Sequence, residues 1–313
     1  MATNQLNTIS GDHCRPKSEK MDEIKTTREL RQRVRVERCR GSSIGLVPTM
    51  GYLHEGHLAL VRKARFENDL LVLSIFVNPT QFAPGEDLDR YPRDLERDRS
   101  LAKQTAVDLL FLPDAEEMYP RGADAQTVWV DPGMLALHLD GASRPGHFKA
   151  VSTIVAKLFN IVEPDRAYFG QKDAQQAAIV ERMVADLAFP IQISVVPTVR
   201  EEDGLALSSR NVYLNEQERK QAGALHRALL LAKQQIASGE RDASKLQFAV
   251  HELVRREAPL ARLEFVEIVD LRTLRPTSRI DGDALLALAL YFGDTRLIDN
   301  LIIHRAGDQL AFS

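Results

Sequence analysis

Two histidines separated by two residues, one of them a glycine, occur in the segment 48–57, which reads PTMGYLHEGH. An apolar run precedes the pair and a helical pattern follows it, so the histidines are expected where a strand passes into a helix. The first turn of a helix has unpaired backbone N–H groups and a partial positive charge, which favour phosphate. His54 and His57 could donate hydrogen bonds to phosphate oxygens as charge builds in a transition state. The glycine between them would let a ligand approach the backbone.

Two other uses of the histidine pair stay open on this pattern alone. Zinc would need a fuller ligand set, and the segment has neither the HExxH arrangement nor a nearby cysteine. The two rings could also cap a solvated turn without binding any ligand. The choice between these uses depends on the other motifs of the chain.

Neutral amides follow the next apolar run, in the segment 74–82, which reads SIFVNPTQF. Asn78 and Gln81 both donate and accept hydrogen bonds, and they suit the hydroxyl groups of a small polar substrate. A plain Asn-Pro turn is the alternative. The stretch 83–94 comes next, is polar and rich in turn residues, and has the composition of a lid.

Three cationic side chains occur in turn-like segments further along the chain. Arg144, in SRPGHF, could clamp a carboxylate through two parallel hydrogen bonds. Lys172, in YFGQKDAQQ, offers a point charge for phosphate. Arg210 follows Ser208 and Ser209 in LALSSRN, a set that suits the β- and γ-phosphates of a nucleotide. A surface loop and a solvated linker are the alternatives for the two arginines.

The neighbours of the lysine have a possible ligand role and a possible structural one. Gly170 permits close approach, and Asp173 could accept hydrogen bonds from ribose hydroxyls. Asp173 and Gln176 also match a helix capping box, in which either side chain would serve only the backbone.

Apolar runs and helical patterns alternate through the first two thirds of the chain. Strands are expected at 43–47, 70–77, 108–112, 166–169 and 191–196, and helices at 57–67, 93–106, 148–162 and 174–187, after an amphipathic helix over 21–41. This alternation predicts an α/β fold, a Rossmann-like doubly wound parallel sheet with helices on both faces. Such sheets bind ligands at the carboxyl ends of their strands.

The alternation stops around 197–211. Beyond it, helices are expected at 215–238 and 243–257, and strands near 262–270, 284–291 and 296–303. We therefore expect a disordered leader over 1–21, a Rossmann-like domain over 22–197 and a small C-terminal α+β lid domain over 198–313.

Composition excludes several classes of protein. The chain has 313 residues, of which 44% are hydrophobic and 27% charged, an ordinary globular composition with room for two domains. Its net charge of −3 gives no general attraction to nucleic acid. Cys14 and Cys39 form neither a disulfide framework nor a CxxC motif, which favours a reducing cytoplasm. No apolar run reaches the roughly 18 residues of a membrane span, and the first residues lack the order of a signal peptide.

The order of the motifs closely resembles that of the pantothenate synthetase (pantoate-beta-alanine ligase) family, over about residues 22–304. The HxGH turn and the later loop with its lysine and serines resemble the HIGH and KMSKS pair of class I adenylate-forming and nucleotidyl-transferring enzymes. Within that larger group, the resemblance to the pantothenate synthetase family rests on seven segments that occur in this order: PTMGYLHEGHLALV, SIFVNPTQF, YPRDLERD, RPGHFKAV, YFGQKDAQQ, VPTVREEDGLALSSRN and TRLIDN.

This resemblance implies an ATP-dependent condensation of pantoate with beta-alanine on the route to coenzyme A. Pantoate carboxylate would attack the α-phosphorus to give pantoyl adenylate and pyrophosphate, and the amine of beta-alanine would then displace AMP. Adenylation turns a poor acyl donor into one with a good leaving group, and cationic donors around the departing pyrophosphate lower its barrier. The resemblance also implies Mg²⁺, a hinged C-terminal domain and a homodimer.

Site residues follow from the resemblance position by position, and those that contact phosphates are the expected catalytic residues. It assigns the phosphates of ATP to His54 and His57, the leaving pyrophosphate to Lys172, Ser208, Ser209 and Arg210, the ribose to Gly170 and Asp173, and the nucleotide pocket to the backbones of Met50, Val199 and Leu207. It assigns pantoate to Gln81 and Gln176, the adenylate and the beta-alanine carboxylate to Asn78 and Arg144, and the magnesium environment to Asp98 as a candidate.

Two positions depart from the family pattern: Leu207 stands where some relatives carry methionine, and Ala150 where glycine is common.

Three rival functions share parts of the pattern. A nucleotidyltransferase of the same superfamily would share HxGH but not NPTQF and KDAQQ together, a tRNA-linked module would be expected to carry a basic stripe, and a non-catalytic scaffold is compatible with the fold. Amine-dependent release of AMP would separate them, and no general base for the amine follows from the sequence.

Overall fold

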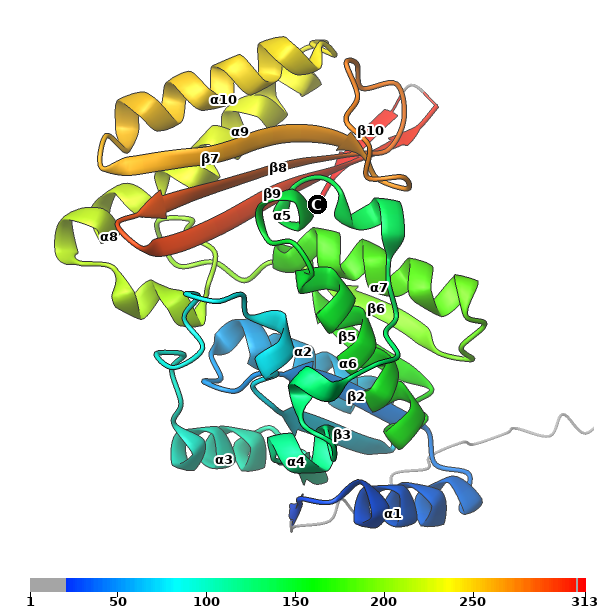
Figure 1. Cartoon of the computed structure of the whole chain (residues 1–313). Coiled ribbons are helices and arrows are strands. Elements are labelled where there is room, and N and C mark those ends of the chain that lie inside the picture. Colours follow the sequence, from blue (N-terminus) through cyan, green and yellow to red (C-terminus); the bar gives the residue numbers. More distant parts are fainter. Residues whose placement is uncertain (1–20, 308) are drawn as a thin grey trace, which may run out of the picture.

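Two β-sheets, one parallel and one antiparallel, organise the computed structural model, which describes residues 21–307 and 309–313 (Figure 1). The parallel sheet has the strand order β1-β4-β3-β2-β5-β6. Its strands are β1 (Asp22–Ile24), β2 (Ile44–Thr49), β3 (Leu70–Ile75), β4 (Leu109–Phe111), β5 (Arg166–Gly170) and β6 (Gln192–Val196). The prediction of a Rossmann-like parallel sheet is confirmed.

Helices cover both faces of this sheet, as the prediction required. They are α1 (Thr27–Cys39), α2 (Glu55–Glu67), α3 (Leu95–Gln104), α6 (His147–Val162) and α7 (Ala174–Asp186). Alternate residues of the central strands point to opposite faces, so Val72 packs with α1, α6 and α7 while Leu71 packs with α2 and α3. This explains why five of the six residues of β3 are apolar, rather than every second one.

Short helical turns complete the loops of this part of the chain. They are η1 (Pro79–Gln81), α4 (Ala115–Met118), η2 (Ala123–Ala125), η3 (Gly133–Ala136), α5 (Asp140–Ser143) and η4 (Gln171–Asp173).

The start of the described chain differs from the prediction. The amphipathic helix expected over 21–41 is preceded by the strand β1, which pairs with β4 at the sheet edge. Thr26 then caps α1 by accepting a hydrogen bond from the backbone N–H of Glu29. A strand of three residues is too short to show a pattern of its own, so only its pairing determines it. The leader expected over 1–21 lies outside the described residues apart from Met21, which is buried.

The strand order reverses at β2, which has β3 on one side and β5 on the other. In doubly wound sheets the crevice that binds ligands opens at such a reversal, beyond the carboxyl ends of the strands. The HxGH turn leaves β2, and the turn that carries Lys172 leaves β5. The topology therefore places these two motifs next to each other.

The C-terminal part is an antiparallel sheet with helices against it (Figure 1). Its elements are η5 (Ser209–Tyr213), α8 (Glu216–Ala222), α9 (Ala224–Ala237), α10 (Ala243–Glu257), β7 (Ala261–Asp270), β8 (Ala284–Phe292), β9 (Thr295–Ala306) and β10 (Gln309–Phe312), with the strand order β10-β9-β8-β7. The single helix expected at 215–238 is wrong, because the chain breaks at Gly223 into α8 and α9. β10 was not expected.

The two sheets are joined by a shared apolar cluster. Leu139, Phe148 and Ile179 pack against Val269 and Leu285 of the C-terminal sheet. An ion pair between Arg296 of β9 and Asp140 of α5, at 2.5 Å, reinforces this contact. The cluster is small compared with the two sheet cores, which suits a junction.

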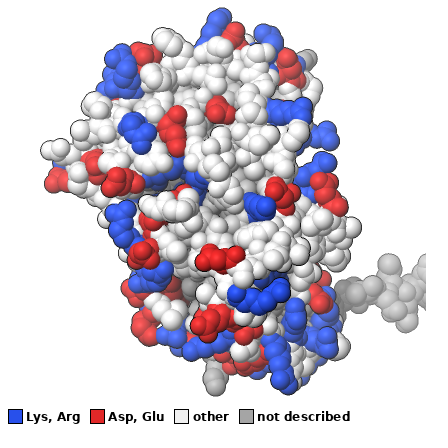
Figure 2. Space-filling model, viewed as in Figure 1, with Lys and Arg blue, Asp and Glu red and all other residues white. Residues whose placement is uncertain are grey.

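The surface agrees with the near-neutral net charge. On the face shown in Figure 2, acidic and basic side chains are interspersed. In the described part of the chain, no helix combines the length and the apolar character needed to cross a membrane.

A close approach at Gly45 sets the position of α2, the helix that begins at the histidine motif. A Cβ atom at Gly45 would lie 2.6 Å from Nδ2 of Asn68. That amide is buried and donates hydrogen bonds to the backbone oxygen of Ala64 and to the hydroxyl of Tyr168, both at 2.7 Å. Because these bonds hold the amide, it cannot move aside without losing them.

We expect Gly45→Ala to lower the free energy of unfolding by about 1–3 kcal/mol, the usual cost of overpacking a core. Urea denaturation followed by circular dichroism measures this change. Gly282→Ala is the matched control, because a Cβ atom there would meet no heavy atom within 4 Å. Equal stability of the two variants would contradict the steric role of Gly45.

Candidate active site

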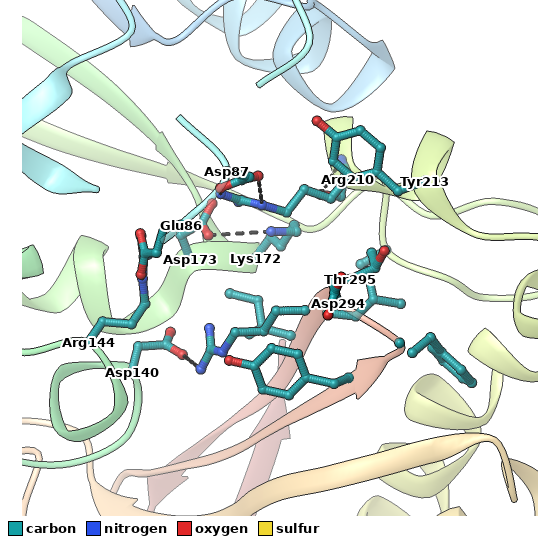
Figure 3. A pocket seen from close by; sticks show the side chains of 18 of the residues that line it. Glu86, Asp87, Asp140, Arg144, Lys172, Asp173, Arg210, Tyr213, Asp294 and Thr295 are labelled. Atoms are coloured by element: carbon teal, nitrogen blue, oxygen red, sulfur yellow. Dashed lines mark hydrogen bonds and ion pairs between the residues drawn. The ribbon is translucent and has the colours of Figure 1, made fainter. Parts of the chain in front are cut away.

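The carboxyl ends of β2 and β5 open into a cavity of about 230 Å³, here called the inner chamber. Of the residues assigned to ATP, substrate or metal, all except Asp98 line it. An outer cleft of about 800 Å³ adjoins the chamber and extends to residues 291–298 of the C-terminal sheet (Figure 3). The chamber lining includes Met50, His54, His57, Asn78, Gln81, Arg144, Gly170, Lys172, Asp173, Gln176, Val199, Leu207, Ser208, Ser209 and Arg210.

The histidine turn places two imidazoles in contact at the start of α2. His54 is the N-cap residue, and Nδ1 of His57 accepts a hydrogen bond from its backbone N–H at 3.3 Å. The ring centroids are 4.0 Å apart. Among the described residues, Nδ1 of His54 is buried without a hydrogen-bond partner, and it lies against the first turn of α2 as in a capping box.

Gly56 has a structural reason that the sequence pattern did not reveal. A Cβ atom at this position would lie 2.9 Å from Cε1 of His54. The glycine therefore makes room for the imidazole, in addition to lining the chamber.

Asp98 lies behind the histidine turn and is 2% exposed. Its two carboxylate oxygens accept hydrogen bonds from the backbone N–H groups of Tyr52, at 2.8 Å, and Leu53, at 2.7 Å. Gly51 and Tyr52 have φ values of 82° and 50°, a left-handed conformation that costs energy at Tyr52. The carboxylate thus holds the turn that delivers His54, and a magnesium role for Asp98 stays a prediction.

Burial lowers the pKa of His54 to about 4, with a smaller contribution from the charge of Lys172. Burial and the neighbouring His54 also lower the pKa of His57 well below its ordinary value. Both imidazoles are therefore neutral at pH 7, and each still has one N–H to donate. The permanent positive charge of the chamber comes from its lysine and arginines.

The turn after β3 carries two amide side chains, Asn78 and Gln81, which have different roles. Asn78 is 1% exposed, and its Oδ1 accepts hydrogen bonds from the hydroxyls of Tyr119 and Thr80. Its Nδ2 donates to Oε1 of Gln81 at 3.2 Å. Asn78 is therefore occupied in orienting Gln81, whose own Nε2 lies 3.0 Å from Sδ of Met50. A thioether is a weak acceptor, so a substrate oxygen can replace it.

Two carboxylates of the lid stretch 83–94 form ion pairs with the two arginines of the chamber (Figure 3). Glu86 accepts from Nε and Nη2 of Arg144 at 2.8 and 2.6 Å. Asp87 accepts from Nε and Nη2 of Arg210 at 2.8 and 2.9 Å. The sequence motifs gave no role to Glu86 and Asp87. Their position in an acidic turn was the one feature of the sequence that could have pointed to them. An arginine fork binds carboxylate and phosphate in the same way, so a substrate anion would compete with the lid.

The lysine turn lies at the end of β5. Nζ of Lys172 is 3.4 Å from Oδ1 of Asp173 (Figure 3). Asp173 is the N-cap residue of α7, yet its side chain accepts no capping hydrogen bond from this helix. The capping box considered for Asp173 and Gln176 is therefore not formed, and the carboxylate remains free of the helix backbone. Gly170 and Gln176 line the chamber on either side of this turn.

The loop that carries Ser208 and Ser209, here called the serine loop, lines the chamber and lies near the start of α2, since a Cβ atom at Gly56 would be 3.9 Å from Cβ of Leu207. The backbone N–H of Leu207 donates to the carbonyl of Val199 at 3.0 Å, which folds the loop on itself. Oγ of Ser208 accepts from the backbone N–H of Arg210 at 3.2 Å. The hydroxyl of Tyr91, from the YPRD motif, lies 3.3 Å from Oγ of Ser209. No role was assigned to this tyrosine beforehand.

Comparison with known proteins confirms the family resemblance. The family model described as pantoate-beta-alanine ligase matches residues 22–302. The pantothenate synthetase of Moorella thermoacetica is 56% identical over 283 residues, which cover 90% of this chain and 99% of that protein.

Solved structures of the family have the same fold. The crystal structure of pantothenate synthetase from Thermus thermophilus has a TM-score of 0.83 and 51% identity, covering 90% of this chain and 98% of that one. The pantoate-beta-alanine ligase from Francisella tularensis, complexed with beta-gamma ATP and beta-alanine, has a TM-score of 0.72 and 33% identity, covering 90% and 97%.

Buried neutral histidines make the stability of the fold depend on pH. Burial, with a contribution from Arg144, also lowers the pKa of His147 to about 4. Between about pH 6.5 and about pH 4 the unfolded chain binds more protons than the folded one, so stability falls as the pH is lowered. We expect His54→Gln to lose less stability than the wild type between about pH 7.5 and about pH 5.

Urea unfolding at the two pH values measures this difference. His251→Gln, on the exposed face of α10, is the matched control for the loss of a histidine side chain. A His54→Gln variant with the full wild-type loss of stability would argue against a buried neutral imidazole.

Proposed function

This chain belongs to the pantoate-beta-alanine ligase family and condenses pantoate with beta-alanine using ATP, and we propose that it does so through a pantoyl adenylate formed in the inner chamber. The observation that carries this proposal is the convergence of the predicted phosphate-binding and substrate-binding residues on one cavity at the reversal of strand order. A chamber of this kind also shields a reactive mixed anhydride from water.

In the first step, a carboxylate oxygen of pantoate attacks the α-phosphorus of ATP, and the bond between that phosphorus and pyrophosphate breaks. Lys172 and Arg210 supply positive charge for the departing pyrophosphate, and Ser208 and Ser209 supply hydroxyl donors. The histidine pair contributes neutral N–H donors at the start of α2. Gly170 and Asp173 hold the ribose, while the backbones of residues 50, 199 and 207 line the nucleotide pocket.

Gln81 and Gln176 bind pantoate, with Asn78 holding the first of these amides in place. In the second step, the amine of beta-alanine attacks the acyl carbon and displaces AMP, and Arg144 binds the carboxylate of beta-alanine. The amine proton leaves to the AMP phosphate or to water.

Arg144 and Arg210 are paired with lid carboxylates in the structure, so substrates must take the place of Glu86 and Asp87. The lid stretch would open to admit the anions and then settle over them.

We propose that Mg²⁺ accompanies the phosphates of ATP. Among the described residues no three His, Cys, Asp or Glu side chains are grouped to hold a metal ion, so the protein offers no complete cage. A magnesium ion carried largely by nucleotide oxygens needs few protein ligands.

We assign residues 22–197 to ATP and pantoate binding and residues 198–313 to a C-terminal lid domain. The family resemblance supports a homodimer, and the free, exposed Cys39 suits a reducing cytoplasm.

A direct test of the reaction is release of AMP that depends on pantoate, ATP and beta-alanine together. Release of pyrophosphate without the amine, followed by amine-dependent release of AMP, would support the adenylate. An AMP moiety that stayed on the product would instead indicate a nucleotidyltransferase.

His54→Ala should lower the rate of pyrophosphate release by about 10²-fold or more, a typical loss for one donor to a transition state. Rapid-quench measurement of pyrophosphate with saturating pantoate gives this rate, and circular dichroism shows whether the fold is intact. His304→Ala, an exposed histidine of β9, is the control. A near-normal rate in the first variant would remove His54 from the mechanism.

Gln81→Ala should weaken the binding of pantoate more than the binding of ATP, because the proposed role of this amide is to bind pantoate and its present acceptor, the thioether of Met50, is weak. Loss of one good hydrogen bond corresponds to roughly tenfold in Kd. Isothermal titration with each ligand separates the two effects, with Gln104→Ala on the exposed face of α3 as control. Equal losses for both ligands would count against the assignment.

A further inference from the structure

Two adjacent polar residues of β9, Asp299 and Asn300, are buried at the junction of the two sheets. They are 2% and 5% exposed and form the end of the TRLIDN motif, to which no role has been given above. Consecutive side chains of a strand point to opposite faces, so the pair reaches two different segments. Figure 1 shows β9 on the side of the C-terminal sheet that faces α5 and the parallel sheet.

Asn300 is bonded to the backbone of the lysine turn. Its Nδ2 donates to the carbonyl oxygens of Gln171, at 3.0 Å, and Lys172, at 2.9 Å. A side-chain amide nitrogen has two N–H groups, and both are used here. Because both partners are acceptors, only a donor can fill this place. The backbone from which the Lys172 side chain extends is therefore held by the C-terminal sheet.

Asp299 holds the start of the serine loop. Its carboxylate accepts from Nη1 and Nη2 of Arg200 at 2.6 and 3.0 Å, two parallel charge-assisted bonds. Arg200 also donates to the carbonyl of Gly204 at 3.0 Å and forms an antiparallel bridge with Ala206. These contacts fix the hairpin that leads into Ser208 to Arg210.

We propose that Asp299 and Asn300 are positioning residues that align the two cationic loops of the chamber with each other. The inference rests on the roles proposed above for Lys172 and Arg210 in expelling pyrophosphate. Two loops from separate parts of the chain meet the same leaving group, so their relative position matters as much as their charge. A misplacement of about 1 Å can lower a rate by up to about 10²-fold.

The decisive variant is Asn300→Leu, which keeps the number of side-chain heavy atoms and the branch at Cγ and removes both donors. We expect kcat/KM for ATP, measured by pyrophosphate release, to fall about tenfold or more. The Kd for pantoate should change less than kcat/KM for ATP, because Gln81, one of the two proposed pantoate ligands, is held by Asn78 rather than by β9. His304→Ala, on the same strand with an exposed side chain, should retain wild-type kinetics.

A double-mutant cycle with Lys172→Ala shows whether Asn300 acts through the lysine. If it does, adding Asn300→Leu to Lys172→Ala should cause no further loss in pyrophosphate release beyond about twofold. Wild-type kcat/KM in Asn300→Leu would overturn the proposal. So would the same loss in both backgrounds, because it would show that the asparagine acts independently of the lysine.

Failure of the inference can be told apart from failure of the proposed function. If Lys172→Ala releases pyrophosphate at the wild-type rate, the role of Lys172 is wrong and the inference falls with it. A slow Lys172→Ala beside a normal Asn300→Leu overturns the inference alone. If Asn300→Leu does not fold, Asn300→Ser, a smaller residue with one donor, takes its place in the cycle and is judged by the same outcomes.

The role of Asp299 is tested with Asp299→Asn, which preserves the shape of the side chain and weakens its ion pair with Arg200. It should slow pyrophosphate release severalfold, and the loss should disappear in an Arg210→Ala background. An equal loss in both backgrounds would overturn the role of Asp299.

Discussion

Keeping several cations together in a partly enclosed chamber is the constraint on which this site depends. Like charges repel strongly where water is scarce, so each cation needs a partner until substrate arrives. The structure meets this need locally: Glu86 and Asp87 take the two arginines, and Asp173 lies beside the lysine. The histidines avoid the problem by being neutral, since burial lowers their pKa.

The fold supplies the convergence that this chemistry needs. Reversal of strand order at β2 brings the ends of β2 and β5 together, and with them the first histidine and the lysine turn. Close packing at Gly45 seats α2 on its strand, and Asp98 holds the backbone just before His54. Positions far from the reacting atoms thereby determine where the donors lie.

The C-terminal sheet contributes to the chamber without lining its inner part. Its β9 strand contacts both cationic loops through Asp299 and Asn300, and Arg296 joins it to α5. Movement of this sheet would therefore be transmitted to the lysine turn and to the serine loop together. If the proposed C-terminal lid domain closes over the chamber, its closure would be coupled to the alignment of the phosphate-binding groups.

The sequence by itself determined the alternating α/β pattern and most element positions, because periodicity is a local property. The chamber residues were named partly from the side-chain chemistry of the motifs and partly from the family resemblance of those motifs. Tertiary structure alone decided that residues 22–24 form a strand, that Asn78 orients a neighbour and that Asp98 is buried against backbone N–H groups. It also brought Asn300 to Lys172, which lies 128 residues earlier. These features depend on contacts between distant segments, and no local pattern records which distant groups will meet when the chain folds.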